Sequence, residues 1–324
     1  MGNITKETWK KGLNTGIKTT WALGKIIFPI TVIVSILSYT SFIEEWIVPL
    51  FTPLMGWLGL PGEAAIPLVL GNVLNLYAAI GAMLSLDLTV KHVFILAVML
   101  SFSHNLLVET AVAKKIGVSA IVPIALRLGL AIISAIAIHL LWQGGGEQAQ
   151  YGMVMQETEV IDSWFMIVLV SVKKALLGIW QIAIIVLPLM VGIQVLKDTH
   201  AIAYFSKMIE PLTRFLGLSS GKTSVPLLAG LIFGLAYGAG VIIQSAEEEN
   251  FSKRDMYLLS IFLVASHAVI EDTLLFIPLG INVIPLLMIR VIVAFIVTIL
   301  TAKVWQRLIP YTESLEQKGE HSEI

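Results

Sequence analysis

Six stretches of about 20 mostly apolar residues recur along this chain and constrain its fold more than any other feature. A helix of roughly 20 residues spans the roughly 30 Å hydrocarbon core of a bilayer. Only 13% of the 324 residues are charged and the mean hydropathy is +0.88, which excludes a soluble domain with a polar surface. The sequence predicts an all-α polytopic membrane protein with spans at 21–40, 91–112, 118–142, 178–197, 256–277 and 283–305.

The remaining composition narrows the function classes. The net charge is −1 and no basic stripe with interleaved aromatics occurs, so nucleic acid is not an expected partner. The first 20 residues are polar and basic, which favours an interfacial helix leading into the first span over a cleavable signal peptide. With no cysteine, disulfides, thiolate metal sites and a cysteine nucleophile are excluded.

The chain contains an internal duplication. Residues 103–142 align without a gap on residues 266–305, and ten of these forty positions are identical, Ser-His, Arg and Trp among them. Upstream the offset falls from 163 to about 159, as in the pairs Trp21/Trp180 and Pro29/Pro188. We therefore divide the chain into a first repeat at 1–145, an external connector at 146–163, a second repeat at 164–311 and a polar cytoplasmic tail at 312–324.

Each copy is expected to contain three spans and two further segments. One is an amphipathic segment with proline and an aromatic residue, at 43–60 and 202–218. The other is a Gly-rich apolar stretch, at 65–86 and 224–245, which is either a full span or a re-entrant hairpin.

Positive charge decides between these alternatives, because Lys and Arg favour the cytoplasmic side of short loops. Residues 38–95 carry one Lys and four acids, whereas the equivalent 197–254 carries six Lys and Arg residues. Equivalent loops should then lie on opposite sides, which requires an odd number of crossings per copy. We predict three spans plus a re-entrant hairpin per copy, both termini in the cytoplasm, and a surface helix at 162–176 to accommodate Lys173 and Lys174.

Inverted repeats with broken helices near the midplane are typical of secondary transporters, whose substrate sits at the repeat interface. Polar groups of the two Gly-rich stretches should face that cavity: Asn72, Asn75, Tyr77, Tyr237, Gln244 and Ser245. His104 and His267 are intramembrane and occupy equivalent positions, which favours a functional role because burying an ionisable group is costly. The alternative is a neutral imidazole satisfied by a neighbouring helix, and close helix packing is the alternative for the glycines.

Two acid–arginine pairs occupy equivalent places around Gly117 and Gly280. An antiparallel helix pair places Glu109 and Arg127 at similar depth, and Asp272 and Arg290 likewise. The pattern favours structural ion pairs, with direct substrate contact by the arginines as the alternative. A metal site is a third possibility.

The candidate metal ligands are His104, His267 and Glu271. His267 and Glu271 are at i,i+4 on one helix face, but Val108 stands where the first copy would need the equivalent acid. Glu109 is about 140° around an ideal helix from His104, so this arithmetic leaves a symmetric metal site incomplete.

The segments SFSHNLLVET and VASHAVIEDT, each after a Gly-rich stretch and before an Arg-containing helix, resemble the nucleoside-recognition, or Gate, membrane proteins. That group includes the spore maturation A and B proteins and, more distantly, the membrane part of ferrous-iron transporter B and the concentrative nucleoside transporters. The resemblance implies solute transport through a site formed by hairpin tips and broken helices, here Asn72, Asn75, His104, Gln244 and His267. Unlike the iron transporters, this chain has neither cysteine nor a fused GTPase domain.

The sequence thus predicts a secondary transporter or exporter of a small polar or anionic solute, nucleoside-like or a carboxylate metabolite, in the cytoplasmic membrane. H⁺ or Na⁺ is the candidate coupling ion, and no other cofactor is expected. The alternatives are a divalent metal ion transporter and a non-transporting subunit of a homodimer or larger complex. An intramembrane enzyme is disfavoured, since no H-E-x-x-H or G-x-S-x-G motif is present.

Overall fold

A computed structural model describes residues 4–40, 42–152, 163–199, 201–218, 223–234, 240–245 and 251–308. Tyr237, the predicted tail at 312–324 and most of the predicted connector, 153–162, lie outside these residues. The described residues are mainly helical and form no β-strand, only one isolated bridge between Thr89 and Gln148. The prediction of an all-α polytopic membrane protein is confirmed.

Six helical segments among the described residues are long and apolar enough to cross a bilayer. Four are continuous helices and two are broken. The continuous ones are α1 (Lys6–Ser38), α7 (Ile121–Leu141), α8 (Trp164–Asp198) and α14 (Val283–Leu308). The broken ones are α5 (Val90–Ser103) with α6 (Leu106–Lys115), and α12 (Lys253–Ser266) with α13 (Val269–Leu274).

The two broken segments form the centre of the protein. Their apolar windows are 78% buried, whereas those of the four continuous helices are only 22–28% buried. The exposed residues of the continuous helices are largely apolar, such as Ile133 in α7 and Ile284 in α14. Exposed apolar side chains on these outer helices fit contact with lipid, while the central pair is shielded from it.

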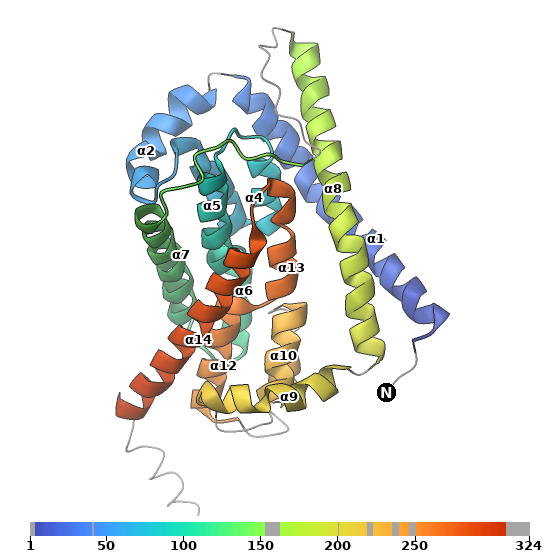
Figure 1. Cartoon of the computed structure of the whole chain (residues 1–324), viewed down its shortest axis with the longest axis vertical. Helices are drawn as coiled ribbons and strands as arrows, with labels where there is room; N and C mark the ends of the chain where they lie inside the picture. Colours follow the sequence, from blue (N-terminus) through green and yellow to red (C-terminus); the bar gives the residue numbers. More distant parts are fainter. Residues whose placement is uncertain are drawn as a thin grey trace, which may run out of the picture.

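Short helices connect the spans (Figure 1). In the first half they are the π-helical η1 (Ile43–Ile47), α2 (Val48–Trp57), η2 (Gly62–Ala64), α3 (Ala65–Val73) and α4 (Leu76–Met83). In the second half they are α9 (Ala201–Phe215), α10 (Ser224–Phe233), a helical turn at 240–245, and η4 (Ile277–Leu279). In Figure 1, α2 lies at the upper end of the molecule and α9, its equivalent, lies across the lower end.

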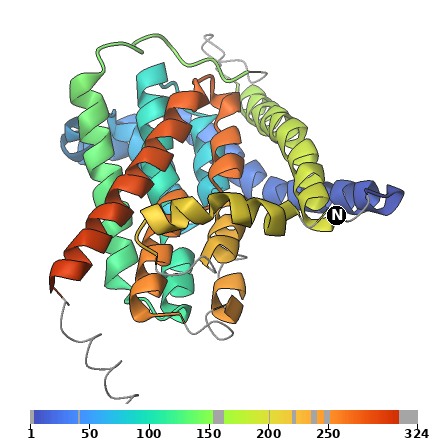
Figure 2. The ribbon, with the colours of Figure 1, turned by 60° about the horizontal axis from the view of Figure 1, so that its bottom comes forward.

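Helices α1 and α8, the first spans of the two repeats, pack side by side along one edge of the molecule (Figures 1 and 2). Gly12 of α1 lies against Val191 and Gly24 against Ile179, so the two helices are antiparallel. A Cβ on Gly12 would collide with the α8 backbone. Gly12 therefore permits a close approach of the two helices, as small residues commonly do where helices pack in lipid.

The equivalent turns of the two repeats lie at opposite ends of the bundle. The turn after Gly117 meets the start of α12, where the Ser119 amide donates to the Tyr257 hydroxyl at 3.3 Å. Gly280 lies instead against Gln150 of the connector, which pairs with the start of α5 through the Ala149 amide and Leu88 carbonyl. The two turns thus contact different parts of the chain, the start of α12 in one case and the connector before α8 in the other.

The structure corrects the expectation of separate surface helices. Residues 6–20 and 164–176 are the first turns of α1 and α8, which continue unbroken for about 50 Å each. Residues 164–177 contain neither glycine nor proline, so nothing ends the helix there. Both helices exceed the roughly 30 Å hydrocarbon core, and parts of each must extend beyond it.

The opposed turns allow a topology test in this naturally cysteine-free chain. Lys115 and Ile277 are exposed at the ends of α6 and η4, whereas Pro278 beside Ile277 is buried and unsuitable for labelling. We expect a membrane-impermeant maleimide to label one of Lys115→Cys and Ile277→Cys in intact cells and the other only after the membrane is permeabilised. Labelling of both from the same side would contradict the inverted arrangement; the unmodified chain is the background control.

Candidate functional site

His104 and His267, the two histidines at equivalent positions, each lie where a central helix breaks. His104 follows α5 and is succeeded by Asn105, whose φ is 53°. His267 follows α12 and is succeeded by Ala268, whose φ is 43°. Among the described residues no other non-glycine side chain has a positive φ. Such backbone is costly for alanine in particular, and it releases amides and carbonyls that hydrocarbon cannot satisfy.

The short helices α3 and α10 satisfy the amides at the two breaks. The Asn105 amide donates to the Gly71 carbonyl at 2.8 Å, and the Ala268 amide donates to the Gly230 carbonyl at 3.1 Å. Gly71 and Gly230 are equivalent in the two repeats. A Cβ on either glycine would collide with the end of a leucine side chain of α5 or α12, so glycine favours the close approach of these carbonyls without displacing that leucine.

Arg127 of α7 satisfies carbonyls at the end of α5. Its Nε donates to the Phe102 carbonyl at 2.6 Å and its Nη2 to the His104 carbonyl at 2.5 Å. Its Nη1 lies 2.6 Å from Glu109 Oε2, so one guanidinium caps the broken helix and neutralises a buried acid. Arg127 is fully buried.

Arg290 of α14 has the equivalent place in the second repeat. Its Nη2 donates to the His267 carbonyl at 2.9 Å and to Asp272 Oδ2 at 3.0 Å. Its Nε and Nη1 have no hydrogen-bond partner among the described residues. Both acid–arginine pairs expected from the sequence are thus formed, and Arg290 makes fewer contacts than Arg127.

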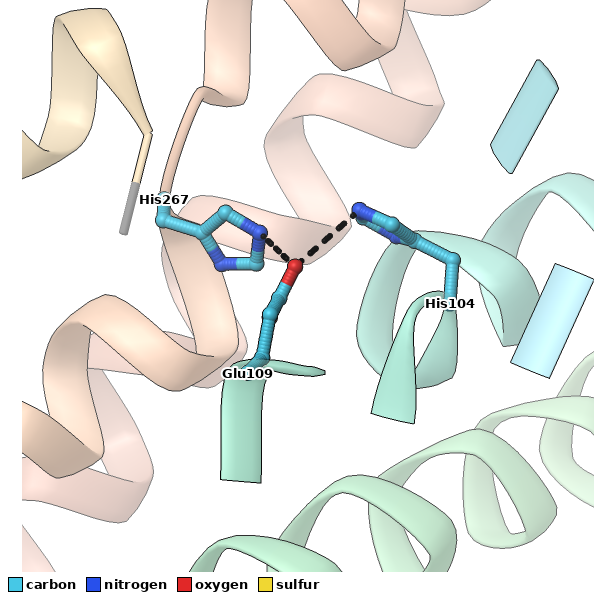
Figure 3. A group of neighbouring side chains, drawn as sticks. All are labelled: His104, Glu109 and His267. Atoms are coloured by element: carbon cyan, nitrogen blue, oxygen red, sulfur yellow. Dashed lines mark ion pairs between the residues drawn. The ribbon is translucent and has the colours of Figure 1, made fainter. Parts of the chain in front are cut away.

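Glu109 brings the two histidines together (Figure 3). Its Oε1 lies 2.9 Å from His267 Nε2 and 3.5 Å from His104 Nε2, and the two rings have centroids 5.4 Å apart. Asp272 Oδ2 lies 3.8 Å from His104 Nε2. All four side chains are at most 8% exposed. The cluster therefore joins groups from both repeats at the centre of the protein.

A cavity of about 260 Å³ opens beside this cluster. Its polar lining comes from both halves of the chain: Asn75, Tyr77, His104, Asn105, Glu109, His267, Glu271 and Asp272. The Tyr77 hydroxyl of α4 donates to Glu271 Oε1 of α13 at 3.0 Å, a second polar link between the repeats. Asn75 caps α4 by accepting the Ala78 amide, so its side chain is held at the tip between α3 and α4.

Other predicted site residues are not brought to the cavity. Asn72, the penultimate residue of α3, donates its side-chain amide to the Leu68 carbonyl of its own helix and does not line the cavity. Gln244 is exposed and Ser245 is half-buried, and neither lines it. Arg127 and Arg290 are also absent from its lining, since both lie behind the acids.

The structure also corrects the expected grouping of metal ligands. His104, Glu109 and His267 offer ligand atoms within 4.8 Å of one another, whereas Glu271 pairs with Tyr77 instead. The 140° separation calculated for His104 and Glu109 assumed an unbroken helix, and the break at Asn105 removes it. The one sequence signal of this break is Asn105, because asparagine adopts left-handed backbone more readily than most residues; Ala268 gives no such signal.

Comparison with known proteins agrees with this two-part arrangement. The nucleoside-recognition family, Gate, matches residues 20–120 and 179–300, one segment in each repeat. The chain belongs to the Gate family. This Gate protein is 52% identical over 305 residues to an uncharacterized membrane protein, YvoD, of Bacillus subtilis (strain 168), covering 94% of this chain and 97% of that one. No solved structure significantly matches it.

The buried ion pairs predict large stability losses in this Gate protein. We expect Arg127→Met and Arg290→Met to lower thermal stability in detergent, by about 3–5 kcal/mol for a fully buried pair, because each leaves an acid unpaired. Arg127→Met should cost more, since Arg127 also holds two carbonyls.

The control is Arg214→Met, which removes an exposed Arg214–Glu210 pair on α9 and should change stability by less than about 1 kcal/mol. The midpoint of thermal unfolding is measured from the folded protein that remains in size-exclusion chromatography after heating. Equal stability of Arg127→Met and the unmodified protein would show that the guanidinium does not support the helix break.

Proposed function

We propose that this Gate protein is a secondary transporter that carries a small, uncharged polar solute across the cytoplasmic membrane. This proposal is supported by the cavity at the junction of two broken helices, which is lined by polar groups from both repeats. Transporters commonly bind substrate at such a place, because irregular backbone near the midplane is tolerated only where it lines a cavity.

The transport proposal includes an inverted-repeat topology. The antiparallel packing of α1 and α8 and the opposed turns at Gly117 and Gly280 support it. Helices α3 and α4 pack together as a short hairpin, which we propose is re-entrant. On this topology both termini are cytoplasmic, and relative movement of the repeats, driven by a proton or sodium gradient, exposes the cavity to each side in turn.

The chemistry of the cavity favours an uncharged solute over the anion that the sequence allowed. Carboxyl groups of Glu109, Glu271 and Asp272 line it, and the arginines that would attract an anion do not. Carboxylates accept hydrogen bonds, so hydroxyl or amine groups of a solute would be their partners. The volume of about 260 Å³ lies just below the roughly 300 Å³ at which small-molecule pockets usually begin, which suits a nucleoside-like or smaller molecule.

The residues that line the cavity favour transport over enzymatic turnover. The described lining residues include no serine, threonine, lysine or cysteine, so Tyr77 is the one hydroxyl there and it already donates to Glu271. A hydrolase of the acyl-enzyme type would need a nucleophile beside a general base.

The Tyr77–Glu271 link provides the test. Purified protein in liposomes is supplied with labelled nucleosides and other small polar metabolites under imposed proton or sodium gradients. We expect gradient-dependent uptake by the unmodified protein and at least a tenfold lower rate for Tyr77→Phe, because a hydrogen bond to a charged group contributes about 1.5–3 kcal/mol.

The matched control is Tyr204→Phe, which removes an exposed hydroxyl from α9 and should transport normally. Absence of gradient-dependent uptake across the whole panel would contradict the proposal. It would favour a non-transporting subunit, and co-purification would then identify the partner of that subunit. Normal uptake by Tyr77→Phe would place the solute elsewhere.

A further inference from the structure

The tautomers of the two central histidines are fixed by their own helices. His104 Nδ1 lies 2.6 Å from the Leu100 carbonyl and His267 Nδ1 lies 3.0 Å from the Leu263 carbonyl. A carbonyl only accepts hydrogen bonds, so each Nδ1 must carry its proton and donate it. In a neutral ring the proton is then absent from Nε2, which is left with a lone pair directed at the other members of the cluster.

This tautomer produces a conflict at Glu109. A carboxylate oxygen also only accepts, yet Oε1 lies 2.9 Å from His267 Nε2 and 3.5 Å from His104 Nε2. His267 Nε2 is buried and has no well-aligned hydrogen-bond partner among the described residues. Three electron-pair donors therefore converge on one point that nothing among the described residues fills with a positive charge. A cation at that point removes the conflict.

We infer that His104, Glu109 and His267 bind a divalent transition-metal ion, with Zn²⁺ or Fe²⁺ as the matching class. Metal ligands at about 2.0–2.1 Å in tetrahedral geometry lie roughly 3.3 Å from each other. The two histidine–glutamate distances bracket that value, and all three ligand atoms lie within 4.8 Å of one another. Two imidazoles with one carboxylate suit zinc and non-haem iron, while the lack of cysteine disfavours copper(I).

The surroundings of the three ligands resemble the supporting shell of a metal centre. Metal-binding histidines usually donate their other ring N–H to a carbonyl or carboxylate, as both do here. Arg127 holds Glu109 through Oε2 and leaves Oε1 directed at the histidines. With neutral histidines, three carboxylates and two guanidiniums give the neighbourhood a formal charge of −1, which attracts a cation: Glu109, Glu271, Asp272, Arg127 and Arg290.

An ion held by His104, Glu109 and His267 would lie beside the cavity, because all three residues line it, and a further ligand could reach the ion from there. Three protein ligands with an open position are typical of metal sites that exchange a water or substrate ligand. The hydroxyl or amine of a solute could occupy that position. The metal site does not depend on the transport proposal, since binding can be measured on protein that transports nothing.

Metal binding can be tested with full-length protein in detergent. The protein is stripped with a chelator, incubated with Zn²⁺ or, without oxygen, with Fe²⁺, and freed of unbound metal before elemental analysis by mass spectrometry. We expect about one metal per chain, with at least 100-fold weaker binding by His104→Gln and by His267→Gln. His139→Gln, which removes a histidine from the far end of α7 outside the cavity, should bind like the unmodified protein.

A spectroscopic measurement keeps the test decisive if the histidine variants fail to fold. Co²⁺ bound to the unmodified protein should give the visible absorption of a tetrahedral site with nitrogen and oxygen ligands. Failure of Zn²⁺, Fe²⁺ and Co²⁺ to bind the unmodified protein would overturn the inference and leave a proton as the shared cation. Metal uptake into liposomes would support the site and change only the identity of the transported solute.

Discussion

The backbone groups released at the two central helix breaks are the constraint on which the rest of this structure depends. Hydrocarbon offers them no water, so each must find a partner within the protein. The Gly71 and Gly230 carbonyls accept the amides, and Arg127 and Arg290 take carbonyls. Because each arginine is itself a buried charge, it requires an acid, and Glu109 and Asp272 follow from that need. The central polar cluster thus stabilises the two helix breaks within the bilayer.

The duplication supplies a frame with nearly equivalent parts, but the site at its centre is not symmetric. Both histidines donate through Nδ1 to the carbonyl four residues earlier, and both arginines hold the acid of their own repeat. Glu109 nevertheless reaches the histidines of both repeats, whereas Asp272 remains 3.8 Å from His104. The fold gives both repeats the same backbone frame. The difference between Glu109 and Asp272 is set by the residues themselves, so the site must be argued from the residues and not from the fold.

Periodicity and duplication were sufficient to predict the six spans and the pairing of Glu109 with Arg127 and Asp272 with Arg290, because those features depend on apolar length and on depth in the bilayer. They could not predict how His104 and Glu109 meet. That contact depends on left-handed backbone at Asn105, which no apolar pattern encodes, and helical geometry misplaces residues on either side of a break. Asn72 failed as a cavity residue for a related reason, since one position in α3 decides which way a side chain points. The expected surface helix at 162–176 is instead the start of α8, because no glycine or proline at 164–177 ends the helix before the span.

Glu109 and Asp272 differ by a single methylene, and this difference decides which carboxylate comes close to both histidines. If both positions carried the longer acid, two carboxylates could reach the same pair of imidazoles, with no change in the number of charges in the cluster. With one long and one short acid, the frame presents a single reaching carboxylate and a second one held back on its own arginine. The two equivalent positions thus differ in reach, and the Glu109 carboxylate is the one that lies within 3.5 Å of both imidazoles. The two halves are alike in the backbone of their helix breaks and in their acid–arginine pairs, and they differ in which carboxylate contacts the histidines.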